Sequence, residues 1–136
     1  MTGLTFARAE TILKAAFTKA DELGVPMTVC LVDSGGRLVL VGRMDGAGWA
    51  TVAIAQAMAE TAAAYRTQGK HLRGAVQDRW FNTIEVAGGR PPLPGEAAIP
   101  FWLDGQFAGA IGVSGGSGEQ DRACAVAGLA AVGVSV

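Results

Sequence analysis

Several side chains beside glycine-rich segments could bind an acidic or metal-containing ligand. His71 is the only histidine of the chain, and an imidazole can ligate a haem iron or act as a general acid or base near neutral pH. Its place after Gly69-Lys70, where a short helix is predicted to begin, is also typical of a solvated histidine. Both interpretations stay open, because no second ligand accompanies His71 at metal-site spacing.

Two methionines extend the set of candidate ligands. The thioether of Met58 could ligate a haem iron, alone or opposite His71, so these two residues are the metal-ligand candidates. The thioether of Met44 could ligate the iron in the same way, and Met44 is also a candidate for binding the rest of the ligand. Methionine also fills irregular gaps in a hydrophobic core, and the sequence alone does not separate this role from ligand binding.

The segment around Arg43 follows a predicted strand and opens a glycine loop, where side chains can meet a ligand. Arg43 suits a carboxylate, although it could equally pair with Asp45 and shape the loop. Asp45, His71 and Asp121 are the candidates for moving a proton, provided that they share a pocket. Trp49 could wall an apolar ligand pocket or anchor a subunit interface.

Other chemistries are disfavoured. The stretch 114–118 lacks the pattern and the Lys-Ser/Thr pair of nucleotide-phosphate loops, and its serine is not centred as in a hydrolase nucleophile elbow. No basic stripe accompanies the aromatic residues, which argues against nucleic acid. Cys30 and Cys124 lie in apolar runs without ligand spacing, so we expect two reduced cysteines in the core.

The elements that position these residues are predicted from periodicity and turn chemistry. Apolar residues at spacings of three and four predict a helix over 6–23, between an N-cap at Thr5 and a C-cap at Gly24. Residues 50–65 are alanine-rich and predicted helical, as are 119–131. A shorter helix is expected over 71–81, and residues 88–100 are expected to form a loop.

Two tight hairpins are predicted between these helices. Residues 27–33 and 37–43 flank a Ser-Gly-Gly turn, and residues 99–103 and 106–113 flank an Asp-Gly turn. In the last strand Phe107, Ile111 and Val113 are expected on one face, and the other face holds only Ala108, Ala110 and Gly112. Another element must come close to that small face. The order predicts an α+β fold with an antiparallel sheet.

Composition supports one cytoplasmic domain over residues 1–136. The chain is 50% hydrophobic and 17% charged, has a net charge of -1 and contains 20 glycines. This profile excludes a disordered arm, and no apolar stretch is long enough to predict a membrane helix. The N-terminus lacks the pattern of a signal peptide. So much apolar sequence in a small domain predicts surface that a second subunit covers in a homo-oligomer.

Four motifs resemble those of the GlcG/HbpS family, which is also similar to the C-terminal domain of PduO-type proteins. The similarity extends over residues 4–131, and the motifs occur in the family's order: Val32-Asp33-Ser34-Gly35-Gly36-Arg37-Leu38, Arg43-Met44-Asp45-Gly46, Gly109-Ala110-Ile111-Gly112-Val113-Ser114-Gly115 and Glu119-Gln120-Asp121. The resemblance implies a profilin-like sandwich in homo-oligomers, with ligand pockets near the hairpin loops. Some relatives bind haem and others are encoded with catabolic enzymes.

Two positions depart from the family's pattern. Met58 stands where relatives usually carry a lysine, and residues 95–100 read Gly-Glu-Ala-Ala-Ile-Pro where relatives tend to have Gly-Gly-x-Pro. The lysine's replacement makes its surroundings less cationic and more apolar.

Two functional hypotheses follow. The first is a small-molecule-binding protein with haem or a related tetrapyrrole as ligand, in which Arg43 holds an acidic group and His71 or Met58 approaches the metal. The second is a cofactor-free enzyme of the isomerase, lyase or hydrolase type that acts on a small organic acid or aromatic metabolite. There Arg43 would bind the substrate carboxylate while Asp45, His71 or Asp121 moves a proton.

Overall fold

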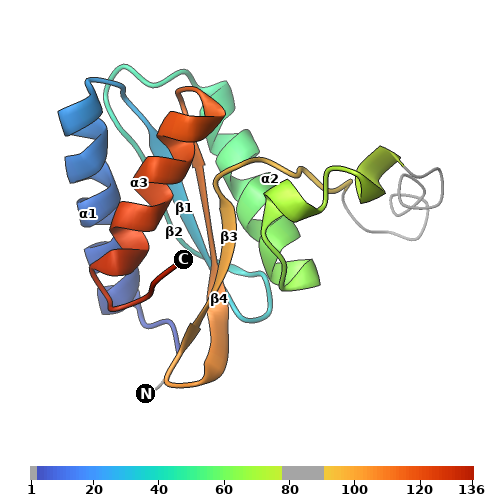
Figure 1. Cartoon of the computed structure of the whole chain (residues 1–136). Coiled ribbons are helices and arrows are strands. Elements are labelled where there is room, and N and C mark those ends of the chain that lie inside the picture. The colour runs from blue at the N-terminus through green and yellow to red at the C-terminus, as the bar shows by residue number, and fades with distance from the viewer. Residues whose placement is uncertain (1–2, 78–90) are drawn as a thin grey trace.

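The computed structural model describes residues 3–77 and 91–136. Along the chain the elements are α1 (Phe6–Leu23), β1 (Thr28–Asp33), β2 (Leu38–Arg43), α2 (Ala50–Tyr65), the 3₁₀ turns η1 (Gly69–His71) and η2 (Ala75–Gln77), β3 (Ala98–Leu103), β4 (Gln106–Ser114) and α3 (Gly118–Ala130). They build three layers, with α1 and α3 on one side of the sheet and α2 on the other (Figure 1). The predicted α+β class is confirmed.

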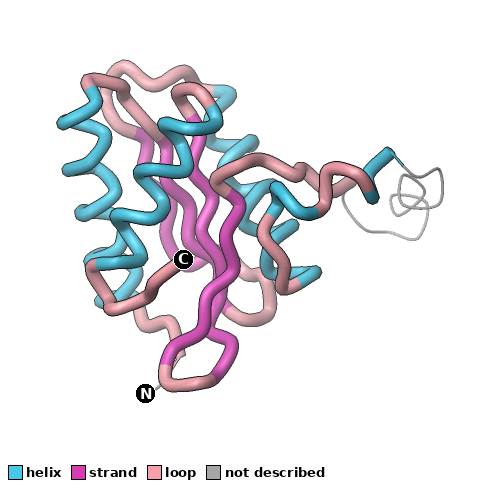
Figure 2. The backbone as a smooth tube through the Cα atoms, in the orientation of Figure 1, coloured by secondary structure: helices cyan, strands magenta, loops and turns pink. Residues whose placement is uncertain are grey.

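The sheet has four antiparallel strands in the order β2-β1-β4-β3 (Figure 2). Each predicted hairpin forms, and the pairing of β1 with β4 joins the two hairpins, with Cys30 opposite Gly112. Because partners across an antiparallel ladder share a face, Cys30 and Gly112 both face α2. Gly42 of β2 faces the other way, where a Cβ on it would lie 2.9 Å from Leu13 of α1.

The helix boundaries follow from capping chemistry. The Thr5 hydroxyl accepts a hydrogen bond from the Arg8 amide at 3.2 Å, and Gly24 ends α1 in the left-handed region with φ 70°. Ser117 and Gln120 form a reciprocal capping box at the start of α3. Among the described residues no helix is long and apolar enough to cross a membrane.

The small face of β4 lies directly against α2, as the sequence predicted. A Cβ on Gly112 would collide with the Ala55 carbonyl oxygen and lie 2.8 Å from the Ala59 amide nitrogen. Ala55 and Ala59 are fully buried. The helix backbone therefore rests on the strand backbone, which only glycine and alanine allow at this distance.

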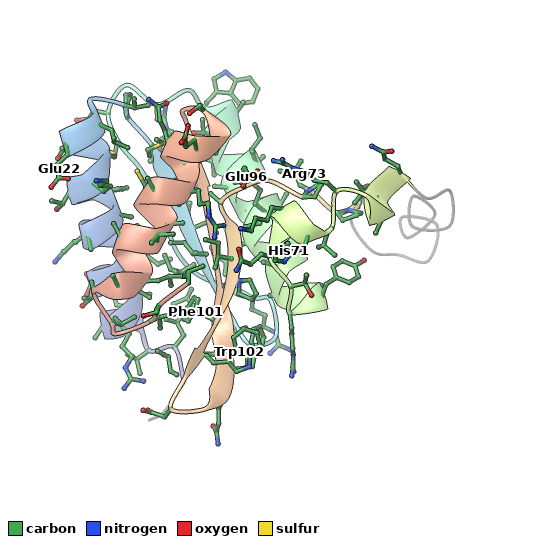
Figure 3. All side chains as sticks on the ribbon, in the orientation of Figure 1. Glu22, His71, Arg73, Glu96, Phe101 and Trp102 are labelled. Carbon is green, nitrogen blue, oxygen red and sulfur yellow. The ribbon has the colours of Figure 1, made fainter. Side chains whose placement is uncertain are left out.

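Phe107 corrects one prediction, because it lies on the opposite face of β4 from Ile111 and Val113. The pairing of β3 with β4 shifts register between Phe101 and Trp102, so that Trp102 pairs with Phe107. The two rings meet edge to face with centroids 5.3 Å apart. The extra residue of this bulge reverses the alternation and turns Phe107 toward the end of α2. Figure 3 shows Trp102 and Phe101 on the strand.

The prediction of a helix over 71–81 is wrong for residues 71–77, the part that the structure describes. The chain forms two separate 3₁₀ turns there, η1 and η2, and residues 78–81 lie outside the described residues. Gly69 begins η1 and is buried against the Gly95 carbonyl oxygen and Ala98. Close packing of this glycine on the following strand fixes a tight turn in place of a longer helix.

Replacing Gly112 with valine tests the close contact between α2 and the sheet. The new side chain would press on the α2 backbone, so we expect a loss of roughly 3 kcal/mol or more in unfolding free energy, at the upper end of overpacking effects. Urea denaturation measures this loss. Gly48→Ala is the control, because a Cβ there meets nothing within 4 Å. Equal stabilities for the two variants would contradict the close contact.

Candidate functional site

A cavity of about 500 Å³ lies between the β1–β2 turn, the second half of α2 and residues 91–92. This volume falls within the range of small-molecule sites. Most of the lining residues are small or apolar, and a few are polar. The lining consists of Ser34, Gly35, Gly36, Ala57, Glu60, Thr61, Ala63, Ala64, Tyr65, Arg66, Pro91 and Pro92. A second hollow of about 460 Å³ lies over α3 and is lined by three alanines and a valine together with the charged residues Lys19, Glu119 and Arg122.

Asp33 fixes the turn that forms one rim of the cavity. Its carboxylate oxygen Oδ1 accepts hydrogen bonds from the amides of Gly35 at 2.9 Å and Arg37 at 3.0 Å. Gly36 takes the left-handed conformation, with φ 76°, that this reversal requires. The turn is thereby held in place, and only the small residues Ser34, Gly35 and Gly36 of this turn line the cavity.

Arg66 supplies a fixed positive charge to the cavity. It is the C-cap of α2 in the left-handed region, with φ 48°, a conformation that costs a non-glycine residue on the order of 1 kcal/mol. Its guanidinium carbon lies 4.6 Å from the centroid of the Phe107 ring, a cation–π contact. Stacking on one face leaves the N–H edges of the guanidinium suited to a carboxylate.

Glu60 and Thr61 are neighbouring polar residues of the cavity wall on α2. Glu60 accepts a hydrogen bond from Gln56 at 3.2 Å. The Thr61 hydroxyl donates to the Ala57 carbonyl oxygen at 2.7 Å and accepts from the Leu93 amide at 2.9 Å. Thr61 therefore connects α2 to the chain segment that carries Pro91 and Pro92.

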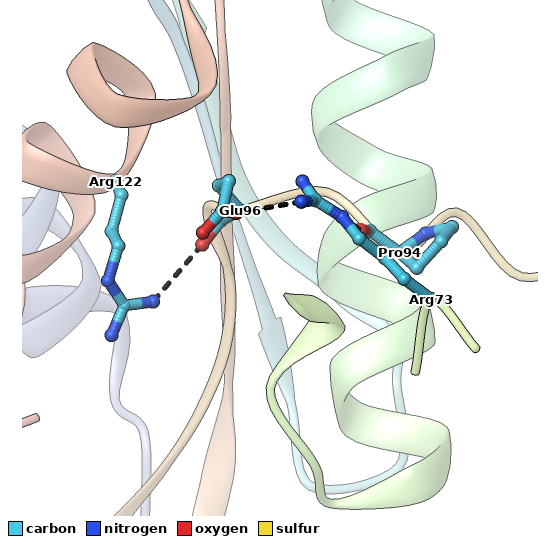
Figure 4. A network of polar contacts seen from close by, with 4 residues as sticks. All are labelled: Arg73, Pro94, Glu96 and Arg122. Carbon is cyan, nitrogen blue, oxygen red and sulfur yellow. Dashed lines mark hydrogen bonds and ion pairs between the residues drawn. The ribbon is translucent and has the colours of Figure 1, made fainter. Parts of the chain in front are cut away.

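A polar network across the β3 edge holds the other end of that segment (Figure 4). The Arg73 guanidinium lies 2.9 Å from the Glu96 carboxylate and donates through Nε to the Pro94 carbonyl oxygen at 3.2 Å. From the opposite side, Arg122 of α3 donates to the Glu96 carbonyl oxygen at 3.2 Å. Residues 94–96 are thus tied both to Arg73, which lies between η1 and η2, and to α3.

Four predicted site residues lie at the other end of α2. Arg43 donates to the Ala47 carbonyl oxygen at 2.8 Å, and the Met44 sulfur accepts from the Met27 amide at 3.3 Å. Asp45 is exposed, and Trp49, just before α2, is 83% exposed. The cavity lining on α2 begins only at Ala57, so about half of this 16-residue helix, roughly 11 Å, separates the loop from the cavity.

The structure places the two candidate metal ligands apart from the cavity lining. His71 is exposed in η1, beside β3 (Figure 3). Met58 is only 3% exposed, and its sulfur packs against Gly95. The two departures from the family's pattern, Met58 and the segment that begins at Gly95, therefore touch each other. Within residues 3–77 and 91–136 no three His, Cys, Asp or Glu side chains gather into a metal site.

Asp121 is half-buried in the first turn of α3. Its Oδ1 accepts a hydrogen bond from the Gly116 amide at 2.8 Å. Burial raises the pKa of this carboxyl from 3.8 to about 6, although the Gly116 bond opposes the rise. A carboxyl with such a pKa suits proton transfer near neutrality, but Asp121 lines neither cavity.

Both cysteines are free and buried, as expected. Burial, together with the charge of Glu60, raises the pKa of Cys30 to about 12. Burial is also the main reason that the pKa of Cys124 rises to about 11. Both thiols stay protonated at neutral pH, so they behave as core residues and not as nucleophiles.

Sequence reasoning missed the cavity residues Glu60, Thr61, Tyr65 and Arg66. One signal was present, because Glu60 and Thr61 are the polar interruption of the alanine-rich run 57–64. A second signal was the end of the helix, where the chain has Arg66 and not the glycine that usually takes the left-handed conformation. Neither signal reveals that a distant hairpin turn lies beside this helix end.

Comparison with known proteins gives a consistent result. Residues 4–130 match the family described as haem degrading protein HbpS-like. An uncharacterized 15.0 kDa protein of Citrobacter freundii is 36% identical over 121 residues, which are 88% of this chain and 84% of that protein.

Two further relatives carry names that mention a ligand or an activity. The corrinoid adenosyltransferase PduO of Citrobacter freundii is 32% identical over 96% of this chain, which spans only 39% of PduO. The solved structure of a PduOC:heme complex superposes with a TM-score of 0.85 at 30% identity, covering 98% of this chain and 97% of the other.

Replacing Asp121 with asparagine tests the effect of its burial. A carboxyl whose pKa is higher in the folded than in the unfolded protein stabilises the fold at low pH and loses that contribution as the pH rises from 3.8 to about 6. Asp121→Asn should therefore be more stable than the wild type at pH 8, on the order of 1 kcal/mol after solvent screening. The difference should vanish below pH about 4.

Thermal denaturation at several pH values measures this difference. Glu119→Gln is the matched control, because Glu119 is an exposed acid in the same first turn, and its replacement should bring no gain at pH 8. A less stable Asp121→Asn at pH 8 would show that the Gly116 bond and the helix dipole outweigh burial.

Proposed function

Because the chain belongs to the HbpS-like family of haem-degrading proteins, we propose that it binds haem in the cavity between the β1–β2 turn and α2. The observation that carries this proposal is the Arg66 guanidinium, stacked on Phe107 at a cavity with alanine and proline walls. Apolar walls suit the faces of a porphyrin ring, and a fixed guanidinium suits a propionate.

The cavity residues fit such a group in volume and in chemistry. About 500 Å³ is enough to enclose much of a flat ligand. Tyr65 lines the cavity and is of a type that ligates haem iron in other proteins. His71 and Met58 stay predictions as iron ligands, since neither lines the cavity. Bound haem would supply iron-centred oxygen or electron chemistry, and the chain would hold the ring and exclude water from its faces.

A haem titration with two arginine variants tests both the ligand and the site. The wild type should shift the Soret band of added hemin. Arg66→Ala should weaken binding by about tenfold or more, the loss of one charge-assisted contact, whereas Arg43→Ala should leave the affinity unchanged. The reverse order would place the ligand at Arg43, the carboxylate-binding candidate of the sequence. An unshifted Soret band would overturn haem binding.

We also infer that a second copy of the chain packs on the outer face of α2. This face exposes alanines beside Ile54, which is 40% exposed, and follows Trp49, which is 83% exposed. Ala57 and Ala64 of the same face line the cavity. Large exposed apolar residues over a close-packing helix favour a subunit interface, and a second copy there would cover the cavity mouth.

Replacing Ile54 with glutamate tests this interface. A charge at the centre of the face should convert the oligomer into monomers, because an unpaired buried charge disfavours association. Analytical ultracentrifugation measures this change. Phe6→Glu is the control, since Phe6 is 55% exposed on α1, on the opposite side of the sheet. A wild type that is monomeric at all concentrations would overturn the inference.

A further inference from the structure

The segment 91–97, here called the strap, forms one wall of the cavity without belonging to any helix or strand. It carries Pro91, Pro92 and Pro94, whose rings fix the backbone angle φ and limit its motion. A segment with few free torsions can be held in place by a few contacts. The strap makes such contacts with Thr61 on α2 and with Arg73 beyond η1.

Thr61 is the contact nearest the cavity. It is 5% exposed, and its hydroxyl uses its proton on the Ala57 carbonyl, which leaves a lone pair for the Leu93 amide at 2.9 Å. Leu93 lies next to the cavity-lining Pro92. A single buried hydroxyl on α2 thus fixes the distance between the helix and the wall.

Arg73 holds the other end of the strap. Its Nε donates to the Pro94 carbonyl oxygen at 3.2 Å while its terminal nitrogen pairs with Glu96 at 2.9 Å. Both partners belong to the strap, and Gly95 between them packs on Met58. The two contacts of one guanidinium therefore fix the direction in which the strap enters β3 (Figure 4).

We propose that Thr61 and Arg73 are positioning residues that hold the strap in its place before the ligand arrives, and so set how long the ligand stays. This proposal rests on ligand binding in the cavity, as argued above. A preformed wall spares the entropy of ordering it on binding. Loss of the contacts that hold the strap should therefore change mainly the dissociation rate of the ligand, the quantity that most often changes among variants of one site.

Variants of Thr61 test the proposal. Thr61→Val keeps the side-chain shape and removes the hydroxyl, whereas Thr61→Ser keeps the hydroxyl. Thr18→Val is the matched control, because the Thr18 hydroxyl also donates to a helix carbonyl four residues earlier, that of Lys14 at 3.0 Å, but is exposed on α1. Two quantities are measured: haem dissociation into an excess of a scavenging apoprotein, and hydrogen exchange at the Leu93 amide without haem.

We expect Thr61→Val to release haem about tenfold faster and to exchange the Leu93 amide faster. Thr61→Ser and Thr18→Val should match the wild type in both measurements. Arg73→Gln should also release haem faster, and Arg73→Lys, which keeps only the charge toward Glu96, should fall between Arg73→Gln and the wild type. Equal release and exchange in Thr61→Val and Thr18→Val would overturn the proposal.

The two proposals fail in different ways. A wild type without a Soret shift overturns haem binding, and the Leu93 exchange of Thr61→Val against Thr18→Val then decides whether Thr61 holds the strap. A wild type that binds haem, with a Thr61→Val variant that releases it no faster, overturns the positioning role alone. If Thr61→Val does not fold, faster release by Arg73→Gln supports the proposal and unchanged release overturns it.

Discussion

The contact between the backbones of α2 and β4 is the constraint on which the rest of the structure depends. Gly112 lets the Ala55 carbonyl and the Ala59 amide approach the strand more closely than any side chain would permit. A helix held so near the sheet must carry alanine on its inner face, which explains the buried alanines of α2. The small residues on the facing sides of α2 and β4 are therefore a requirement of this interface.

That constraint also determines where polar chemistry can occur. Where α2 lies on Gly112 there is no room for long side chains, so those that can reach a ligand lie along the flank of α2 and at its C-terminal end. Glu60 and Thr61 project from the flank, and Arg66 leaves the last turn toward Phe107. The cavity forms where the β1–β2 turn and the strap lie beside that end. Its wall thus combines the small residues of the helix with a few strongly polar groups.

The sequence predicted the three helices, both hairpins and the close approach to the small face of β4, because periodicity, caps and turn glycines are local signals. Phe107 escaped prediction since a β-bulge depends on the partner strand and not on the alternation within β4. The helix predicted over 71–81 does not form in its described part, because the packing of Gly69 on the next strand is a tertiary contact that local signals do not contain.

The candidate site was harder to predict than the fold. Arg43 and Arg66 both follow apolar segments and both suit a carboxylate, but the sequence does not show which end of α2 adjoins a cavity. Both arginines are exposed, but only Arg66 lines the cavity, and Met58 is buried with its sulfur against Gly95. Spacing along the chain identifies ligand-type residues, whereas their access to a ligand depends on contacts between distant segments.

The network around Glu96 has a consequence for the sheet itself. Strand β3 is an edge strand, and an open edge invites pairing with the backbone of another chain. Here Gly69 presses against Ala98, Arg122 reaches across to the Glu96 carbonyl, and Pro100 removes one amide donor from the strand. The β3 edge is therefore protected against the addition of a foreign strand and against the aggregation that follows from it.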